Sequence, residues 1–280
     1  MTDAPADRRD RGTWSRERRT LIVDAVDSPD TVPEPFALLS ESVRVDVPLE
    51  FEPHTHRLHE LVWVRGGTMS VRLPDRVVTV PDGYGIWMPA GTEHSGRTTA
   101  GAHLYDALFE PSRSPEVSSR SMVVEVTPLL GELLVHLQRD DLAERERLRA
   151  ESVVFDLLAS AERAFDLRVP RAERVGPIVA ALLDDPADRR SLAEWSEAVG
   201  VSERTVARLF RTHTGLSFTQ WRQALVVHHA LSLLAEGQSV QDVSDVCGFA
   251  QPSTFIAAFK RVMGTTPGAY VTRLEQRRRS

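Results

Sequence analysis

The sequence is poor in cysteine, since Cys247 is the only one among 280 residues. A single thiol excludes an internal disulfide framework and fits a reducing compartment. We expect Cys247 to be a small buried apolar residue rather than a reactive thiol. The sequence also lacks an apolar run of the ~18–20 residues that a membrane span needs. Its charged N-terminus has no apolar segment behind it, as a secretory signal would. These absences predict a cytoplasmic protein with no membrane partner.

The net charge of −6 is modest and by itself argues weakly against a nucleic-acid partner. The two parts of the chain differ, however. Residues 174–280 hold 13 Arg or Lys and 10 Asp or Glu, whereas residues 1–173 hold 21 and 30. A basic C-terminal part can approach phosphates while an acidic N-terminal part stays away from them.

The length suits two domains, at ~100–200 residues for each. Between residues 43 and 109, short apolar runs are broken by Gly and Pro, which is typical of a β-sandwich or β-barrel. Apolar residues recur at helical spacing after that region. The expected organisation is a polar, disordered arm over 1–20, a β domain over 21–125, a helical segment over 126–165, a linker over 166–176 and an all-α domain over 177–278.

The segment 126–165 predicts two amphipathic helices. Leucines from Leu129 to Leu137 and apolar residues from Val153 to Ala161 recur at helical spacing, and the opposite faces are charged. Such a pair packs either on the β domain or on its copy in a homodimer. The sequence leaves both arrangements open.

Residues 191–211 predict two short helices joined by a tight turn. Ser191 can cap the first helix and Gly200 can end it, and Ser202 can cap the second. The outer face of the second helix is basic. This is the helix-turn-helix arrangement, whose second helix enters the major groove of double-stranded DNA.

The same pattern repeats from Ser239, with a turn at 247–249 and a second helix from Pro252 to Met263. Its core candidates are Phe255, Ile256 and Phe259. An apolar helix over 218–235 joins the two units and is ~27 Å long at 1.5 Å per residue. That length can hold two recognition helices about one DNA turn (~34 Å) apart, so that one chain reads two successive major grooves.

Residues 174–273 resemble the AraC/XylS family of transcription regulators. The resemblance rests on several motifs at once, which are Val201-Ser202-Glu203-Arg204-Thr205, Arg208-Leu209-Phe210, Gly215, Leu233-Leu234, Gly237, Cys247-Gly248-Phe249, Ser253, Phe255, Phe259-Lys260 and Gly264-Thr265-Thr266-Pro267. A doubled, spaced set of this kind is far more specific than a single helix-turn-helix match.

This resemblance implies which residues contact DNA. They are Arg204, Thr205, Ala207, Arg208 and Arg211 in the first unit and Gln251, Pro252, Ser253, Thr254, Ala257 and Lys260 in the second. Arg211 and Lys260 are expected at phosphates, which anchor without specifying sequence. Alanine cannot hydrogen-bond a base edge, so we expect base readout to depend on Arg204 and Arg208. The second unit then contributes mainly through DNA shape and backbone contacts.

The β domain contains a histidine pattern. His54, His56 and Glu60 share one face of an extended chain while His59 points to the other, and His94 follows later. Three imidazoles and a carboxylate suit a divalent transition metal.

The pattern resembles the two motifs of the cupin barrel, which implies metal ligands at His54, His56, Glu60 and His94 and an ion such as Zn, Fe, Mn or Ni. Three roles stay open for these side chains: a metal site, an effector pocket without metal, and plain structural histidines. The remaining histidines, His228 and His229 included, are expected at the surface or in helix packing.

The expected fold class is α+β multidomain, with an N-terminal cupin-like barrel or sandwich, a helical extension and a C-terminal all-α domain with two helix-turn-helix motifs. The expected function is sequence-specific transcription regulation, controlled by a small-molecule or metal signal. Promoter DNA, an effector, a second copy of the chain and, for an activator, RNA polymerase are the expected partners. No catalytic residues are assigned and the chain is not expected to be an enzyme. The alternative is a metal-dependent cupin enzyme that carries a DNA-binding module.

Overall fold

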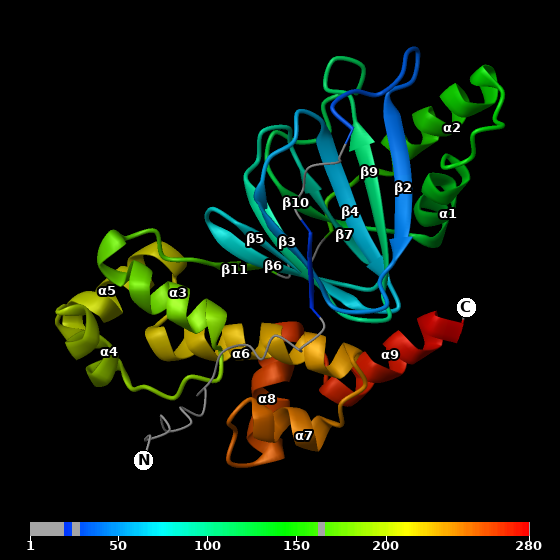
Figure 1. The fold of residues 1–280 in the computed structure, drawn as a ribbon. Coiled ribbons are helices and arrows are strands. Elements are labelled where there is room, and N and C mark those ends of the chain that lie inside the picture. The colour runs from blue at the N-terminus through cyan, green and yellow to red at the C-terminus, as the bar shows by residue number, and fades with distance from the viewer. Residues whose placement is uncertain (1–19, 24–28, 162–165, 280) are drawn as a thin grey trace, which may run out of the picture.

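The computed structural model describes residues 20–23, 29–161 and 166–279. The arm expected over residues 1–20 therefore lies outside the described residues, except for Thr20. Figure 1 shows a β domain above a helical domain, with two further helices on the outer side of the β domain. This arrangement confirms the predicted α+β fold class.

The β domain consists of two facing sheets. Six strands form one sheet in the order β1-β3-β8-β5-β6-β11, and five form the other in the order β10-β7-β4-β9-β2. The strands are β1 (Leu21–Val23), β2 (Leu38–Arg44), β3 (Leu49–His54), β4 (His59–Arg65), β5 (Thr68–Leu73), β6 (Arg76–Pro81), β7 (Tyr84–Met88), β8 (His94–Thr98), β9 (His103–Phe109), β10 (Met122–Glu125) and β11 (Asp166–Arg168).

Alternation along these strands explains the barrel core. Val62, Val64 and Leu104 face inward and pack with Val71 and Val80 of the opposite sheet, because side chains two apart point to the same face. The same periodicity turns Glu60 and Asp106 toward this interior, on the strands that carry those apolar residues.

Two helices cover the outer face of the five-stranded sheet. They are α1 (Pro128–His136) and α2 (Glu144–Leu157). Leu130, Leu134 and Val154 join the cluster of Trp63 and Trp87 on that face. The helices therefore pack on the barrel, while Leu129 and Val153 remain 60% and 42% exposed on their outer side.

The second of these helices is shorter than the spacing from Val153 to Ala161 predicts. It ends at Leu157, and Ser160 then forms a β-bridge with Val124. The N–H of Ala161 also donates to the carbonyl of Val123 at 2.8 Å. Strand β10 lies at the edge of its sheet and offers backbone groups for pairing. Ser160 and Ala161 pair with this edge instead of continuing the helix.

The C-terminal domain is helical. Its elements are the 3-10 turn η1 (Glu173–Val175), α3 (Gly176–Asp184), α4 (Leu192–Val199), α5 (Glu203–Thr214), α6 (Phe218–Ala235), α7 (Val240–Val246), α8 (Pro252–Met263) and α9 (Pro267–Arg279). None of the described helices is long and apolar enough to span a membrane.

The helix boundaries follow the capping residues read from the sequence. The side chains of Ser191, Ser202 and Ser239 accept from backbone N–H groups in the first turns of α4, α5 and α7. Gly200 ends α4 in the left-handed conformation, with φ 65°, which glycine adopts without a Cβ clash. Two helix-turn-helix units result, α4–α5 and α7–α8. We name them the first and second unit.

One core prediction in the second unit is wrong. Phe255, Ala258, Phe259 and Met263 fill the buried face of α8, whereas Ile256 is 36% exposed. A residue next to Phe255 lies about 100° around the helix, so it reaches the flank and not the core.

Helix α6 is buried on nearly all sides. Figure 1 shows it between the barrel and the pair α7–α8. Phe218, Trp221 and Leu225 belong to the core of the first unit, whereas Val227 and Leu231 belong to the core of the second. A helix that is apolar all round is buried all round.

The segment expected as a linker, 166–176, is in part a strand. Asp166–Arg168 form β11, which pairs antiparallel with β6 of the barrel. Leu167 of this strand is 3% exposed and belongs to the core of the first unit. The indole Nε1 of Trp221 donates to the carbonyl of Arg168 at 2.7 Å. The connection is therefore fixed to both domains, because its side chains complete one core while its backbone completes the sheet.

A buried hydrogen bond joins α6 to the barrel. Thr79 Oγ1 of β6 and Nδ1 of His228 are 2.7 Å apart. Thr79 is 0% exposed and His228 is 5% exposed. Burial lowers the pKa of His228 to about 4, and burial together with the charge of Arg97 lowers that of His229 to about 4. Both imidazoles are therefore neutral in the folded chain near neutral pH.

These two histidines predict that the folded state weakens in acid. Unfolding returns each pKa to about 6.5, so the unfolded state binds more protons between pH 6.5 and 4 and stability falls as the pH falls through that window. From pH 7.5 to pH 5 each histidine lowers the unfolding free energy by about 2 kcal/mol. Urea unfolding of the wild type and of His228→Asn at several pH values measures this, and the variant is expected to lose less stability. Equal losses in both chains would contradict the assignment.

Candidate functional site

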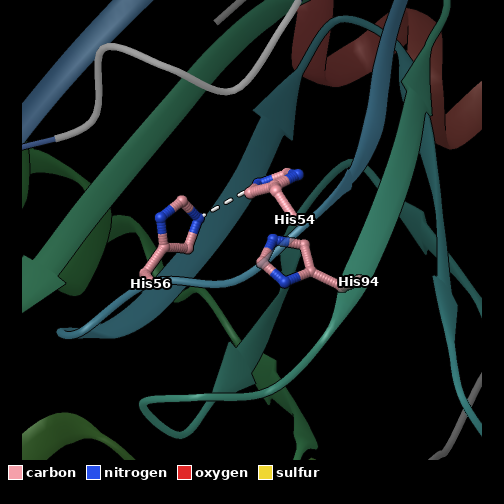
Figure 2. Close-up of side chains that lie close together, drawn as sticks. All are labelled: His54, His56 and His94. Carbon is pink, nitrogen blue, oxygen red and sulfur yellow. Dashed lines mark hydrogen bonds between the residues drawn. The ribbon is translucent and has the colours of Figure 1, made fainter.

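Three histidines converge inside the barrel, at one end of β3 and β8 (Figure 2). His54 ends β3, His94 begins β8, and His56 lies in the turn between β3 and β4. Their nearest ring nitrogens all lie within 4.8 Å of one another. Nε2 of His54 and Nε2 of His56 are 3.1 Å apart. The sequence pattern is thus brought together in space.

Glu60 completes this group. Its Oε2 lies 3.1 Å from Nε2 of His94 and 3.5 Å from Nε2 of His56. Glu60 is 7% exposed, and this oxygen makes no well-aligned hydrogen bond among the described residues. We name His54, His56, Glu60 and His94 the barrel cluster.

Backbone carbonyls orient two of the rings. Nδ1 of His54 donates to the carbonyl of Glu52 at 2.6 Å, and Nδ1 of His94 donates to the carbonyl of Thr92 at 3.0 Å. When Nδ1 carries the proton, a neutral imidazole presents the lone pair of Nε2, here toward the cluster. Metal-binding histidines are usually held in this way.

Burial and charge shift the pKa values of the three histidines in different directions. Burial lowers the pKa values of His54 and His56, so both are neutral near neutral pH. Burial also disfavours the charged form of His94, but the Glu60 carboxylate, 3.1 Å from Nε2 of His94, outweighs burial and raises the pKa of His94. The cluster therefore combines two neutral imidazoles, a third imidazole whose protonated form is favoured, and a carboxylate. This set can hydrogen-bond a polar effector, or it can bind a divalent cation in exchange for the proton of His94.

His59 and Asp106 stand beside this group in different ways. Nδ1 of His59 accepts from the N–H of Ala90 at 2.9 Å, so His59 serves the turn after β7 and not the cluster. Asp106 Oδ1 has no hydrogen-bond partner among the described residues. Burial, followed by the charges of Glu60 and Glu41, raises the pKa of Asp106 well above its usual value. The sequence analysis missed Asp106, although its alternation with Leu104 and Leu108 on β9 was a usable signal.

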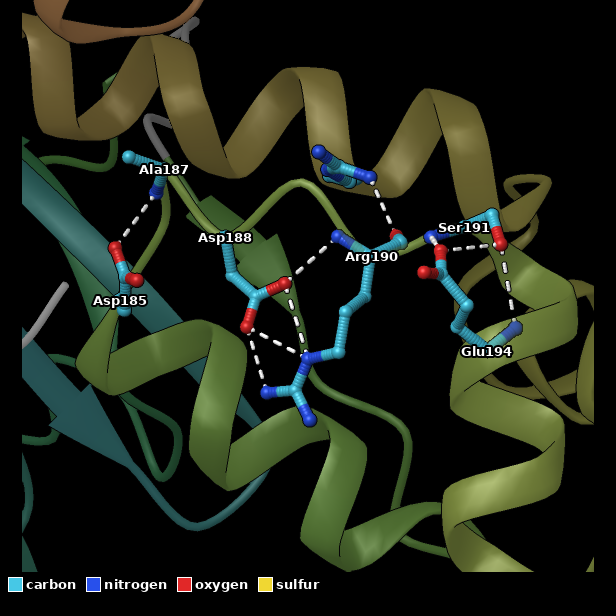
Figure 3. A network of polar contacts seen from close by, with 7 residues as sticks. Asp185, Ala187, Asp188, Arg190, Ser191 and Glu194 are labelled. Atoms are coloured by element: carbon cyan, nitrogen blue, oxygen red, sulfur yellow. Dashed lines mark hydrogen bonds and ion pairs between the residues drawn. The ribbon is translucent and has the colours of Figure 1, made fainter. Parts of the chain in front are cut away.

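A polar network positions the first unit against α6 (Figure 3). Nη2 of Arg190 donates to Asp188 at 2.6 Å, and the guanidinium lies 3.4 Å from the ring centre of Trp195. Nη1 of Arg222, on α6, donates to the carbonyl of Arg190 at 2.9 Å. Ser191 and Glu194 form a reciprocal capping box at the start of α4. These contacts fix the loop that leads into the first unit.

The outer face of α5 presents its arginines to solvent. Arg204, Arg208 and Arg211 are exposed, whereas Ala207 is half-buried. The hydroxyl of Thr205 lies 3.0 Å from that of Ser202 in the helix cap, so it is engaged within its own helix. Two of the five predicted DNA-binding positions on α5 are therefore less available than the arginines.

The outer face of α8 is more weakly charged. Gln251, Ser253, Thr254, Ala257 and Lys260 are exposed, and Pro252 is half-buried at the first turn. Ser253, Thr254, Ala257 and Lys260 lie on the exposed side of α8, away from its buried row, whereas Gln251 precedes the helix as its N-cap. Arg261 is also exposed, but it donates to Gln223 of α6 at 2.6 Å and is held there.

Family models cover both domains of the chain. Residues 48–158 match the AraC-like ligand binding domain. Residues 195–273 match a helix-turn-helix domain.

Curated relatives agree with these matches. The HTH-type transcriptional regulator NimR of Escherichia coli strain K12 is 32% identical over 225 residues, which are 79% of this chain and 82% of that protein. The HTH-type transcriptional regulator RipA of Corynebacterium diphtheriae is 29% identical over 212 residues, which are 76% of this chain. The alignment spans only 60% of the length of RipA.

Among solved structures, the DNA-binding domain of AdpA, in complex with a target DNA, is 29% identical and has a TM-score of 0.37. That match covers 39% of this chain and 99% of the AdpA domain. The enzyme alternative finds no support among the relatives. The domain matches and the long alignment with NimR show that the chain belongs to the AraC family, as a DNA-binding transcription regulator with an N-terminal ligand-binding domain.

Proposed function

We propose that this regulator responds to a divalent transition metal held by the barrel cluster. The observation that carries the proposal is the convergence of three histidine nitrogens within 4.8 Å of one another, with the buried Oε2 of Glu60 beside two of them, those of His56 and His94. A buried carboxylate oxygen is costly unless it is well paired, and a cation would satisfy it better than imidazoles at 3.1 and 3.5 Å. His54, His56 and His94 with Glu60 would hold the ion, which would supply a strong local positive charge inside the barrel.

A small effector without metal is the second candidate. The direct contact between His54 and His56, at 3.1 Å, favours it, because these rings satisfy each other without an ion. Asp106 favours it too, because its buried Oδ1 has no hydrogen-bond partner among the described residues and a polar effector in the interior would supply one. Either ligand would act by favouring one arrangement of the regulator over another.

We also propose which residues read the DNA. Arg204 and Arg208 would hydrogen-bond base edges, and Arg211 and Lys260 would contact phosphates. Thr205 and Ala207 lie between Arg204 and Arg208 in the sequence and would approach the same groove. Gln251, Pro252, Ser253, Thr254 and Ala257 would seat α8 in the second groove mainly through shape. This division follows from charge, because α5 presents three exposed arginines. On α8 the exposed cations are Lys260 and Arg261, both near the end of the helix, and Arg261 is held by Gln223.

The remaining partners are inferred from the surfaces. The outer side of α1 and α2, with exposed Leu129 and Val153, would pair with a second copy of the chain. RNA polymerase is a partner if the protein activates. A promoter as the target would make the protein cytoplasmic. Because the relatives are regulators, we assign the barrel to sensing and not to catalysis.

Loss of a base-reading arginine should weaken specific binding selectively. Arg208→Ala is expected to reduce affinity for the selected site by about 1–3 kcal/mol, because a bidentate contact to a base is lost. Fluorescence anisotropy on selected and on random DNA measures the effect, with Arg120→Ala, at an exposed position just before β10, as the matched control. An equal loss on both DNAs would show that Arg208 only binds phosphate.

Metal occupancy should depend on the residues of the barrel cluster and not on the neighbouring His59. Elemental analysis of the protein, purified without added chelator, is expected to find about one transition-metal ion per chain. His56→Ala and His94→Ala should reduce this content at least about tenfold, because losing a ligand removes much of the affinity. His59→Gln should leave it unchanged. A metal-free wild type with intact regulation would refute the metal site and favour the effector pocket.

A further inference from the structure

The two helix-turn-helix units have separate hydrophobic cores. Trp195, Val206 and Phe210 centre the first, and Val243, Phe255 and Phe259 centre the second. Helix α6 contributes to both, and Val262 of α8 packs at the edge of both. The relative placement of the recognition helices α5 and α8 therefore rests largely on one helix within the DNA-binding domain.

The six-stranded sheet contacts a residue from the hydrophobic core of each unit, Trp221 for the first and Tyr270 for the second. On the side of the first unit, β11 inserts Leu167 into its core and accepts the indole N–H of Trp221. Arg72 of β5 donates to the carbonyl of Leu183, in α3, at 2.9 Å. On the side of the second unit, Thr68 Oγ1 lies 3.3 Å from the hydroxyl of Tyr270, in α9.

The buried bond between Thr79 and His228 lies between these two sets of contacts. The sheet residues involved share one face, because Thr68 and Arg72 alternate along β5 and Thr79 pairs with Ser70 between them. This face is the outer surface of the barrel, opposite the side that lines its core. The contacts thus form one continuous seam along the sheet, which we name the platform.

We propose that the platform is part of the DNA-binding machinery: the outer face of β5, β6 and β11 clasps both helix-turn-helix units and fixes the distance and rotation between α5 and α8. The side chains that carry this role are Thr68, Thr79 and Arg72 of the sheet with Tyr270 and His228 of the helical domain. They are positioning residues, since they lie at the seam and not on the exposed faces of α5 and α8. The inference does not depend on a metal or an effector in the barrel.

A rigid protein binds only DNA whose groove spacing matches the spacing of its recognition helices. Each base pair inserted between two bound segments moves the second groove by about 3.4 Å along the duplex axis and rotates it around the axis. A pair of readers joined only by α6 can adjust by bending that helix, whereas readers also clasped by a sheet cannot. The full chain should therefore discriminate sharply between DNA spacings, and it should lose that discrimination when the seam is weakened.

The test uses the full chain and a DNA site obtained by in vitro selection with it. Duplexes carry no insertion or one, two or three extra base pairs between the two bound segments. The wild type is expected to lose about tenfold or more in affinity upon insertion of two base pairs, the scale of a strong mismatch. The double variant Thr79→Val, Tyr270→Phe removes one hydroxyl group from each of the two contacts Thr79–His228 and Thr68–Tyr270 and keeps the side-chain volumes nearly unchanged. It should lose about threefold or less on the same DNA.

The control is Ser42→Ala, which removes a hydroxyl from β2, in the other sheet. It should discriminate as the wild type does. Wild-type discrimination in the double variant would overturn the proposal, and so would equally weak discrimination in all chains. Should the double variant fail to fold, as judged by circular dichroism, Arg72→Ala removes the exposed contact to α3 and must reduce discrimination in the same direction.

The outcomes separate this inference from the proposed function. Zinc binding, measured on the same samples by isothermal titration calorimetry with Zn²⁺ alone, decides the barrel cluster and has no bearing on the spacing result. A chain that binds Zn²⁺ but shows no effect of the seam variants refutes the platform alone. A chain that binds no Zn²⁺ but loses spacing discrimination in the variants refutes the metal site alone.

Discussion

The structure depends on the burial of α6 between a β-sheet and two helical units. Its apolar side chains provide most of the free energy of packing, since each fully buried large side chain contributes about 1.5–3 kcal/mol. Its polar groups determine the position of the helix along the sheet. Leaving Thr79 or His228 unpaired in the interior would cost about 1–3 kcal/mol for each group, whereas their bond adds only about 1 kcal/mol net. The apolar contacts thus hold the helix to the sheet, and the hydrogen bond decides where it sits.

The barrel cluster and the seam are built on the same sheet. Strand β8 begins at His94 inside the barrel and carries Arg97 three residues later, whose charge acts on His229 of α6. Odd and even positions on one strand point to opposite faces, so β8 presents one residue to the interior and the other to the helical domain. A shift of this strand would reach both places directly, with no need for a relay through α1 and α2.

The sequence predicted local structure well wherever a local rule applied. Serine caps and glycine stops located α4 and α5, and the histidine pattern identified side chains that the fold brings together. It failed where the partner is distant in the chain. Asp166–Arg168 lack turn or strand signals strong enough to reveal pairing with β6, so the sequence predicts a linker there. His228 was expected at the surface or in helix packing, but its partner Thr79 lies 149 residues away. The apolar character of α6 showed that it is buried without showing against what.

The two recognition helices differ in a way that makes a fixed spacing useful. Helix α5 presents exposed arginines, which can select bases, while α8 presents serine, threonine and alanine, which fit a groove without strongly selecting its sequence. A weak reader adds specificity only if it is held at a set distance and rotation from a strong one, because misplacement then removes its contacts altogether. Few exposed side chains of α8 can select bases. If the sheet holds α8 rigidly relative to α5, the DNA must still present its second groove at the right distance and rotation for α8 to bind. Specificity in this chain would then have two sources. Helix α5 would select bases, and the fixed spacing between α5 and α8, which the barrel helps to set, would select the distance between the two bound DNA segments.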